Sequence, residues 1–335
     1  MKKKSIWVLV LTLCLFVSAC SSNTSSSGSA SGSESKQLKL AHNLSEDHPV
    51  HKALAKFAEN VEQNSDGALK VKIYSNGVLG SEKEVLEQLQ SGAVDMTKVS
   101  AGALESFSKE YSVFSLPYIF TSKEHYHEVM NSDVAKQVYQ STKDDGFIGF
   151  TWFTSGARSF YTVDKQVEKP ADLNGLKIRV MDSPTAIKMV ELLGGTPTPM
   201  PFGEIYTALQ QGVVDGAESN VTALTTGKHG EVAKVFSRNE HTMIPDIGII
   251  STKTWESLSD DEKSVIEKSA QEATAYHSEQ WDKSIAEETE KAKEMGVTFT
   301  EVNKEPFIEK VQPLHEEMKE DADIAKLMED IKELE

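Results

Sequence analysis

The stretch NGLKIRVMDSPT, residues 174–185, sets the pattern for the rest of the chain. Leu176, Ile178 and Val180 alternate with polar residues, which is the period of a half-buried strand. Arg179 lies on the opposite face of that strand, in a chain whose formal net charge is −17. An arginine on a rigid strand either meets water or holds an anion. The rest of the sequence decides between these two interpretations.

Predicted strands and helices alternate outward from this stretch. Alternating or continuous apolar residues predict strands at 37–43, 69–74, 93–100 and 147–153. Amphipathic segments with capping signals lie between the strands and predict helices. This order of elements is typical of an α/β fold in which most strands pair in parallel.

A short internal echo predicts two related lobes. Residues 89–95 read LQSGAVD and residues 209–215 read LQQGVVD, so each has a helix end, a terminating glycine and a strand that carries an aspartate. Because the echo is short, a chance match is the alternative. In open α/β sheets ligands lie beyond the carboxyl ends of strands, so both units would deliver side chains to one crevice. Those side chains are Lys98, Ser100, Ser219 and Asn220.

The segment from Ser259 to Gly296 predicts an unusually long helix. Ser259 and Glu262 have the spacing of a capping box, and Gly296 is a natural C-cap. About 36 residues without proline or glycine lie between them, enough for roughly 54 Å of helix. We expect this helix to span both lobes; two shorter helices with a break are the alternative. The acidic tail after Phe307 is predicted to be helical and solvated.

The N-terminus has the pattern of an export signal. Three lysines at 2–4 precede the apolar segment IWVLVLTLCLFV, and the segment ends in small residues before Cys20. This resembles a bacterial lipobox, and we expect residues 1–19 to be removed and Cys20 to be lipidated. An ordinary signal peptide or a short membrane anchor is the alternative. The Ser-rich segment up to residue 36 predicts a flexible tether.

The composition excludes several classes of partner. Without its first nineteen residues the chain loses three lysines and no acids, which takes the formal charge from −17 to −20. So acidic a chain argues against nucleic acid and anionic lipid as partners. The mature chain keeps one cysteine and no disulfide. About 300 residues suffice for two lobes, and we expect a monomer.

Two arginines are expected to form a cationic site. Arg158 follows the predicted strand 147–153, and Arg179 lies on the next alternating strand. Arginines near the ends of successive strands can converge on one anion. The guanidinium fork matches a carboxylate in bidentate fashion, with charge-assisted bonds that exceed neutral ones in strength.

Several long motifs resemble the solute-binding proteins of tripartite ATP-independent periplasmic (TRAP) transporters. The central ones are GLKIRVMDSP and GGTPTPMPFGEIYTALQQGVVDGAES. FSLPYIF, NGVLGSEKEVLEQLQSGAVD and GARSFYT fit the same family. The resemblance covers residues 37–310. It implies two lobes hinged by crossing strands and braced by a long helix.

The resemblance also implies site residues. The arginine of the family's G-L-K-x-R-V motif, here Arg179, forms the bidentate bridge to a substrate carboxylate. Arg158 supplies a second cationic contact, and Asn43 matches a position that often touches ligand. The family's D-G-x-E-N segment commonly gives an asparagine to the carboxylate. This chain instead has Ser219 in that place and Asn220 next, and serine offers one hydrogen-bond donor on a shorter side chain.

Other candidates have more than one interpretation. Lys98 either contacts a second anionic or hydroxyl group or is solvated. Trp152 and Phe202 either line the crevice and stack on an apolar sugar face or belong to the core. His48 and His51 lie three apart near a helix start, but no thiol or firmly placed carboxylate completes a metal site, so we expect neither metal nor cofactor.

Together these features predict an α/β, two-lobed fold of the periplasmic-binding-protein type, with hinge strands and a long helix spanning both lobes. The first lobe is expected at 37–155 plus about 245–284. The second is expected at 156–244 plus about 285–335.

The predicted function is binding, not catalysis. We expect a membrane-tethered, extracytoplasmic lipoprotein that closes on a small organic acid and delivers it to a TRAP permease. Polar crevice residues favour a sugar acid, a uronate or aldonate; a C4-dicarboxylate or keto acid is the alternative. A further alternative is that the same binding protein serves as the ligand-sensing input of a sensor kinase instead of a permease. An exported hydrolase of acidic sugars is the alternative from a different class, although the G-x-S-x-G, H-E-x-x-H and P-loop motifs are absent.

Overall fold

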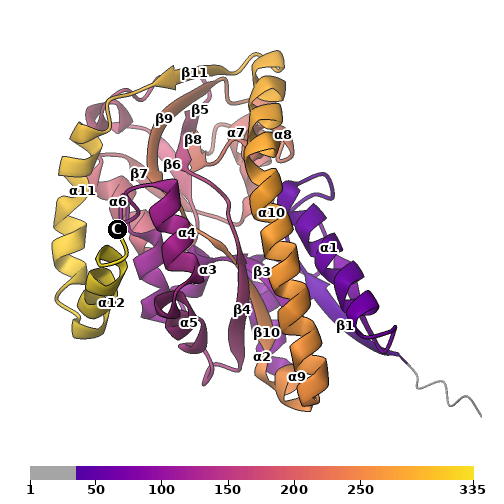
Figure 1. The fold of residues 1–335 in the computed structure, drawn as a ribbon. Coiled ribbons are helices and arrows are strands. Elements are labelled where there is room, and N and C mark those ends of the chain that lie inside the picture. Colours follow the sequence, from indigo (N-terminus) through magenta and orange to yellow (C-terminus); the bar gives the residue numbers. More distant parts are fainter. Residues whose placement is uncertain (1–34) are drawn as a thin grey trace, which may run out of the picture. The chain divides into compact units, whose positions relative to one another are not determined.

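Two mixed β-sheets organise residues 35–335, the part of the chain that the computed structural model describes (Figure 1). The first sheet contains β1 (Lys36–Ala41), β2 (Leu69–Tyr74), β3 (Met96–Ser100), β4 (Phe147–Phe153) and β10 (Asp246–Ser251). The second contains β5 (Arg158–Thr162), β6 (Lys177–Val180), β7 (Thr196–Pro199), β8 (Gly216–Ser219), β9 (Val235–Thr242) and β11 (Thr298–Glu301). We call each sheet with its helices the first and the second lobe. The predicted α/β fold class is confirmed.

Helices cover both sheets and connect their strands. The α-helices are α1 (Pro49–Asn64), α2 (Glu82–Ser91), α3 (Ala101–Leu104), α4 (Lys123–Asn131), α5 (Asp133–Gln140), α6 (Pro184–Leu192), α7 (Ile205–Gln210), α8 (Thr222–Thr225), α9 (Thr252–Ser257), α10 (Asp260–Glu294), α11 (Glu305–Met318) and α12 (Ala322–Lys332). The 3₁₀ segments are η1 (Lys109–Ser115), η2 (Pro170–Leu173), η3 (Phe202–Glu204) and η4 (His229–Glu231). No helix within residues 35–335 is both long and apolar enough to cross a bilayer.

The strand pairing is less parallel than the sequence predicts. The first sheet has the order β2-β1-β3-β10-β4, and the second has the order β11-β9-β5-β8-β6-β7. Five of the nine pairings in the described residues are parallel, and each of the four antiparallel pairings involves β5 or β10. The reason is topological: β5 and β10 each enter their sheet directly from the other lobe, so they run against their neighbours.

The internal echo corresponds to a repeated structural unit. The order β2-β1-β3-β10 of the first sheet recurs as β7-β6-β8-β5 in the second. The aspartate of each echo bonds to a neighbouring strand: Asp95 Oδ2 accepts from the Lys39 amide, and Asp215 Oδ2 accepts from the Lys177 amide, both at 2.8 Å. Because these aspartates fix equivalent strands, their side chains are structural and are not free for ligand.

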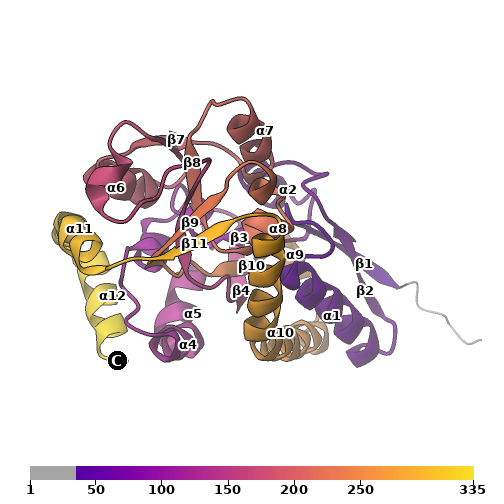
Figure 2. The same ribbon diagram turned by 90° about the horizontal axis from the view of Figure 1, so that it is seen from above.

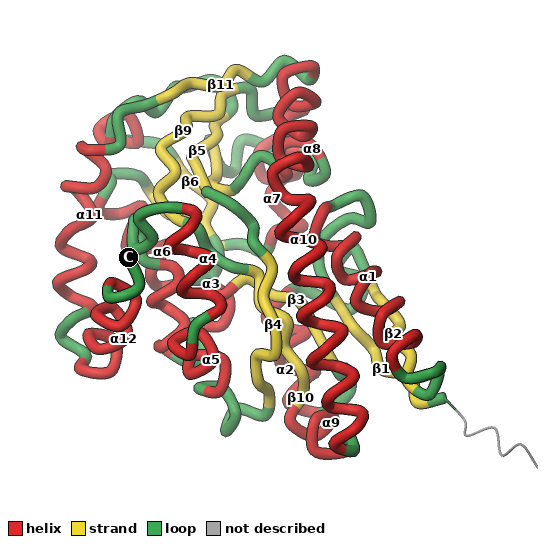
Figure 3. The backbone as a smooth tube through the Cα atoms, in the orientation of Figure 1, coloured by secondary structure: helices red, strands yellow, loops and turns green. Residues whose placement is uncertain are grey.

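Two short segments connect the lobes and form the predicted hinge. Residues 154–157 connect β4 to β5, and residues 243–245 connect β9 to β10 (Figure 3). The two segments run side by side, because Ser155 Oγ donates a hydrogen bond of 2.5 Å to the carbonyl of Ile244. A movement of one lobe relative to the other therefore has to involve both of these segments together.

Gly156 lies in the first of these segments and leaves no room for a side chain. Its φ is +63°, and a Cβ would come within 3.0 Å of the Trp281 ring. We expect Gly156→Ala to lower the free energy of unfolding by about 2–4 kcal/mol, because backbone strain and overpacking add. Gly175→Ala is the control, since its φ is +80° with nothing within 4 Å. Equal losses in urea denaturation of the two variants would contradict a role for the ring contact.

Helix α10 is unbroken and serves both lobes, as the sequence predicts. It runs for 35 residues and begins with the capping box of Ser259 and Glu262. Its first half contributes Ile266 and Ala270 to the core of the first lobe, beside α1 (Figure 2). Its last turn contributes Ala292 to the core of the second lobe. The predicted helix spanning both lobes is therefore confirmed.

The C-terminal tail is helical but is not merely solvated surface, so that expectation is wrong. Helices α11 and α12 bury one apolar face each, through Phe307, Val311, Leu314, Ile324, Leu327, Met328 and Ile331. Helix α11 packs on α6, whereas α12 packs on η1 and α5. The acidic residues that suggested a solvated tail occupy the opposite faces. The exact lobe boundaries stay a prediction, and the signal peptide, Cys20 and most of the tether lie outside the described residues.

Candidate ligand-binding site

Two adjoining cavities lie between the first and the second lobe. The inner chamber has a volume of about 60 Å³, and the outer cavity has a volume of about 640 Å³. Both are lined by Asn43, Glu82, Arg179, Met181 and Phe202. The inner chamber lies beyond the carboxyl ends of β1, β3, β6 and β8, the place where open α/β sheets bind ligands.

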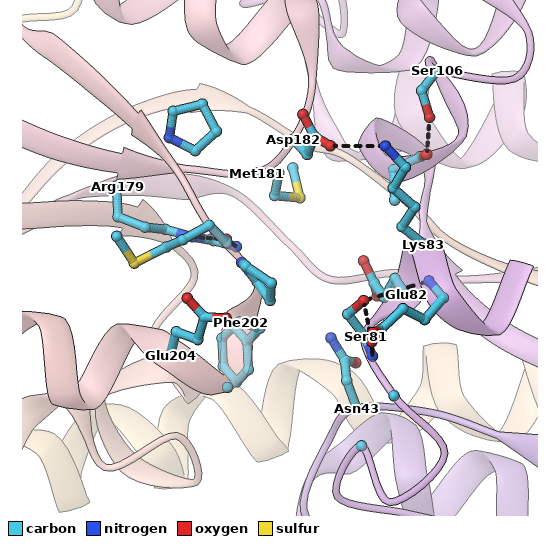
Figure 4. Close-up of a pocket in the computed structure, with 18 of the residues that line it drawn as sticks. Asn43, Ser81, Glu82, Lys83, Ser106, Arg179, Met181, Asp182, Phe202 and Glu204 are labelled. Carbon is cyan, nitrogen blue, oxygen red and sulfur yellow. Dashed lines mark hydrogen bonds and ion pairs between the residues drawn. The ribbon is translucent and has the colours of Figure 1, made fainter. Parts of the chain in front are cut away.

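Arg179 is buried on a strand whose two faces are both covered. Ile178 and Val180 are fully buried on one face, and Arg179 is only 4% exposed on the other. Its side chain extends from the second lobe toward the gap, opposite Glu82 of the first lobe (Figure 4). The solvated interpretation of this arginine is therefore wrong.

The Arg179 guanidinium has no carboxylate partner among the described residues. Its Nε and Nη2 donate to the carbonyl of Met200 at 2.9 and 2.7 Å, and no other acceptor within residues 35–335 is within hydrogen-bond distance. Burial lowers its pKa to about 10, although the nearby charge of Glu218 opposes that shift. At neutral pH it is therefore a buried cation. A guanidinium carries five N–H donors, so its end-on edge stays available to an anion.

Arg158 is already ion-paired within the second lobe. Its Nε and Nη2 donate to the carboxylate of Glu218 at 2.6 and 2.9 Å. Burial opposes ionisation of Glu218, but Arg158 and a hydrogen bond from His241 lower the pKa of this carboxyl to about 2. Arg158 also lines the inner chamber, so its contact with a ligand carboxylate stays a prediction. The role of Arg158 that the structure shows is its ion pair with Glu218.

Lys98 is buried, not solvated, and it joins two carboxylates. Its ammonium donates to Glu82 Oε1 at 3.2 Å and to Asp246 Oδ1 at 3.1 Å. Burial alone would lower the pKa of Lys98, yet these two carboxylates raise it. We call Lys98, Glu82 and Asp246 the lysine triad. All three of its members line the inner chamber.

The remaining polar candidates also reach the inner chamber. Asn43, Ser100, Ser219 and Asn220 all line it. The carboxamide oxygen of Asn43 is buried without a hydrogen-bond partner among the described residues. The oxygen of Asn220 accepts from both the amide and the hydroxyl of Thr222 at 2.8 and 2.6 Å, so its amide nitrogen is left as a donor. A buried acceptor without a partner is costly, so Asn43 indicates a missing donor.

Of the two aromatic candidates, only one reaches the cavities. Phe202 lines both of them. Trp152 lines neither, and instead packs edge-on against Tyr126 and His127 in the core of the first lobe. Its indole N–H donates to Asn131. The ligand-contact interpretation of Trp152 is therefore wrong: in the strand β4 its side chain faces the helices, not the gap.

Sequence reasoning missed three titratable side chains of the inner chamber: Glu82, Asp246 and His48. Glu82 lies between Ser81 and Glu84, which form a capping box, so its position suggested only the start of a helix. Asp246 had no local signal, since its partner Lys98 lies 148 residues away. His48 was considered only as a metal ligand, but its Nε2 lies 2.9 Å from Thr222 Oγ1 in the other lobe. Burial lowers its pKa well below the ordinary value, so this bridge between lobes is neutral.

Metal ligands do not gather in the described part of the chain. No group of three or more His, Cys, Asp or Glu side chains within residues 35–335 is arranged to hold a metal ion. His42 and His51 contact each other at 3.0 Å, and burial lowers the pKa of His42 to about 3. Both rings are thus held by hydrogen bonding and packing.

Two lobes with a hinge and a buried, unpaired cation between them define a solute-binding protein for anions. The family comparison agrees: the chain belongs to the DctP family, family 7 of the bacterial extracellular solute-binding proteins, whose model matches residues 40–321. This family comprises the TRAP solute-binding proteins, so the resemblance in the sequence is confirmed.

Similar proteins are known from several bacteria. YiiZ of Salmonella typhimurium is 46% identical over 81% of this chain and 84% of its own length. A TRAP periplasmic solute-binding protein of Anaerococcus prevotii, solved with bound D-glucuronate, is 38% identical with a TM-score of 0.87. That match covers 89% of this chain and 98% of the other. A Bradyrhizobium protein solved with D-galacturonate is 33% identical with a TM-score of 0.87, covering 89% and 100%.

Proposed function

We propose that this TRAP solute-binding protein captures a hexuronate such as D-glucuronate or D-galacturonate. The observation that carries the proposal is the buried Arg179, a cation without a carboxylate partner in the described residues. The uronates bound by the Anaerococcus and Bradyrhizobium proteins support the same ligand class. The ligand carboxylate would occupy the end-on edge of this guanidinium.

The charge of the site supports a carboxylate as the anchored group. Taking a guanidinium out of water costs several kcal/mol unless an anion compensates it. Met200 offers Arg179 only a neutral carbonyl. A bidentate carboxylate supplies both the missing charge and two charge-assisted hydrogen bonds. Affinity for the acid end therefore follows from the buried positive charge of Arg179, which no carboxylate within residues 35–335 pairs with.

The polar residues of the chamber support a hydroxylated ligand. Asn43 presents an acceptor without a partner, and Asn220 presents a free donor. Sugar hydroxyls both donate and accept, so one ring can satisfy the two residues. Phe202 at the edge of both cavities provides an apolar face for the C–H side of the ring. A ring of this kind would occupy the inner chamber and part of the outer cavity.

Ligand binding would favour the closed arrangement of the lobes. Arg179 and Asn220 belong to the second lobe and Asn43 to the first, so one ligand bridges both. A ligand that touches both walls only when they are close has higher affinity for the closed state, and this difference drives closure. We further propose that the closed protein delivers its ligand to a TRAP permease. Lipidated Cys20 and the Ser-rich tether would hold it at the cell membrane.

A thermal-shift series over sugar acids tests the proposal. At ligand concentrations near 100 times Kd, we expect about 2.7 kcal/mol of stabilisation and an unfolding temperature about 5 °C higher. D-Glucuronate and D-galacturonate should produce this shift. D-Glucose is the matched control, because it has the same ring without the carboxylate. A shift with D-glucose as large as that with the uronates would contradict the anchoring role of Arg179.

A further inference from the structure

The lysine triad has unused acceptor capacity. Glu82 Oε1 accepts from the Lys98 ammonium and, at 3.1 Å, from the Ser100 amide. Asp246 Oδ1 accepts from the same ammonium. No hydrogen bond from any residue within 35–335 reaches Glu82 Oε2 or Asp246 Oδ2. Each carboxylate therefore has a second oxygen without a donor, in a residue that lines the inner chamber.

These oxygens lie in the wall of the first lobe, which faces Arg179. Asp246 is 6% exposed and lines the chamber. Glu82 extends from the start of α2 toward the gap, across from Arg179 (Figure 4). Asn43, whose oxygen also lacks a donor, lies in the same wall. The wall opposite the arginine thus presents oxygens that can accept hydrogen bonds from ligand hydroxyls.

The charges of the site are divided unequally between its two walls. Arg158 and Glu218 cancel each other. Lys98 is outnumbered by its two carboxylates, so the lysine triad carries a net charge of about −1 at neutral pH. Arg179 carries a positive charge and makes no ion pair with any carboxylate within residues 35–335. One anionic group neutralises the arginine, whereas a second anionic group at the other end of the ligand would face like charge.

We propose that Glu82 and Asp246 select sugar monocarboxylates by accepting hydroxyl hydrogen bonds and repelling a second carboxylate. This inference rests on the proposed function, since it assumes that Arg179 holds the acid end. Charge-assisted hydrogen bonds from ligand hydroxyls to these oxygens add affinity. Like charges brought together across a desolvated contact cost several kcal/mol, which excludes the wrong ligand. The site therefore prefers uronates and aldonates to aldarates and C4-dicarboxylates.

The variants Glu82→Gln and Asp246→Asn test this selection one carboxylate at a time. Each leaves Lys98 with one carboxylate, so the ammonium keeps an ion pair while the triad becomes neutral. The ligands are D-glucuronate and D-glucarate, which differ at C1, where glucarate has a second carboxylate. Glu128→Gln is the matched control, because Glu128 is an exposed glutamate on α4 that lines neither cavity.

Isothermal titration calorimetry should show opposite changes for the two ligands. In each triad variant we expect the Kd of D-glucuronate to rise about 10-fold and that of D-glucarate to fall about 10-fold. General damage to the fold lowers both affinities, so it cannot produce this pattern. The Glu128→Gln control should leave both Kd values within about twofold.

Two results would overturn the inference, and they are distinguishable from failure of the proposed function. If the wild-type protein binds D-glucarate as tightly as D-glucuronate, the wall does not select against a second carboxylate. If the triad variants lose both ligands in parallel, the carboxylates only support the fold. If the wild-type protein binds neither ligand, the hexuronate proposal itself fails, and the inference falls with it.

Discussion

Replacing Arg179 by methionine is expected to weaken the binding of D-glucuronate by about 100- to 1,000-fold. The ligand carboxylate would enter a desolvated chamber without its counter-ion. The ligand-free protein should keep its stability within about 1 kcal/mol, because the variant loses the hydrogen bonds to the Met200 carbonyl but also removes the cost of burying the guanidinium. Calorimetric titration measures the first effect, and urea denaturation measures the second.

Arg238→Met is the matched control for this variant. Arg238 is also a second-lobe arginine, but it pairs with Glu301 at 3.1 Å and lines neither cavity of the site. We expect it to retain full affinity. Retention of ligand by Arg179→Met, or an equal loss in both variants, would refute the anchoring role of Arg179.

The main expected effect of replacing Arg158 by methionine is a loss of stability of the folded protein. It leaves the Glu218 carboxylate buried without its main partner, which costs about 3–5 kcal/mol and lowers the unfolding temperature by about 6–15 °C. The double variant Arg158→Met with Glu218→Leu should recover most of this loss, because an apolar pair needs no compensation. Differential scanning calorimetry of the single and double variants checks both statements.

The pH dependence of stability gives an independent check on this pair. The pKa of Glu218 in the folded protein is about 2, below the ordinary value of 4.5. The contribution of the Arg158–Glu218 pair to the free energy of unfolding is therefore complete above pH 4.5 and is lost as the pH falls toward 2. The stability difference between wild type and Arg158→Met should narrow over that range. A variant that keeps wild-type stability but loses ligand would instead make Arg158 chiefly a ligand contact.

The sequence predicted features that depend on local chemistry. The alternating strand with Arg179, the capping box at Ser259 and the glycine-terminated echoes are each set by neighbouring residues, and all are present in the structure. The motifs of the family supplied the two-lobed arrangement and the placement of Arg179. These are the parts of the fold for which short-range patterns suffice.

Features that depend on distant pairs could not be predicted. The ion pair of Arg158 was missed because Glu218 lies 60 residues away. Lys98 was left open between a ligand contact and a solvated lysine because Asp246 lies 148 residues away. The antiparallel strands β5 and β10 follow from the crossing of the chain between lobes, which no local pattern encodes. Likewise, the strand that contains Trp152 is apolar on both faces, so its sequence does not show which way the Trp152 side chain points. Packing against α4 decides this.

The separation of the two walls by lobe has a consequence for protein engineering. The arginine that would grip the acid belongs to β6, whereas Asn43, Glu82 and Asp246 belong to the other lobe. Under this arrangement the group that would hold the acid and three of the groups that would contact the sugar belong to different sheets. A mutant library restricted to those three positions would therefore vary the contacts to the sugar and leave the arginine in place, which would suit the design of biosensors for other sugar acids.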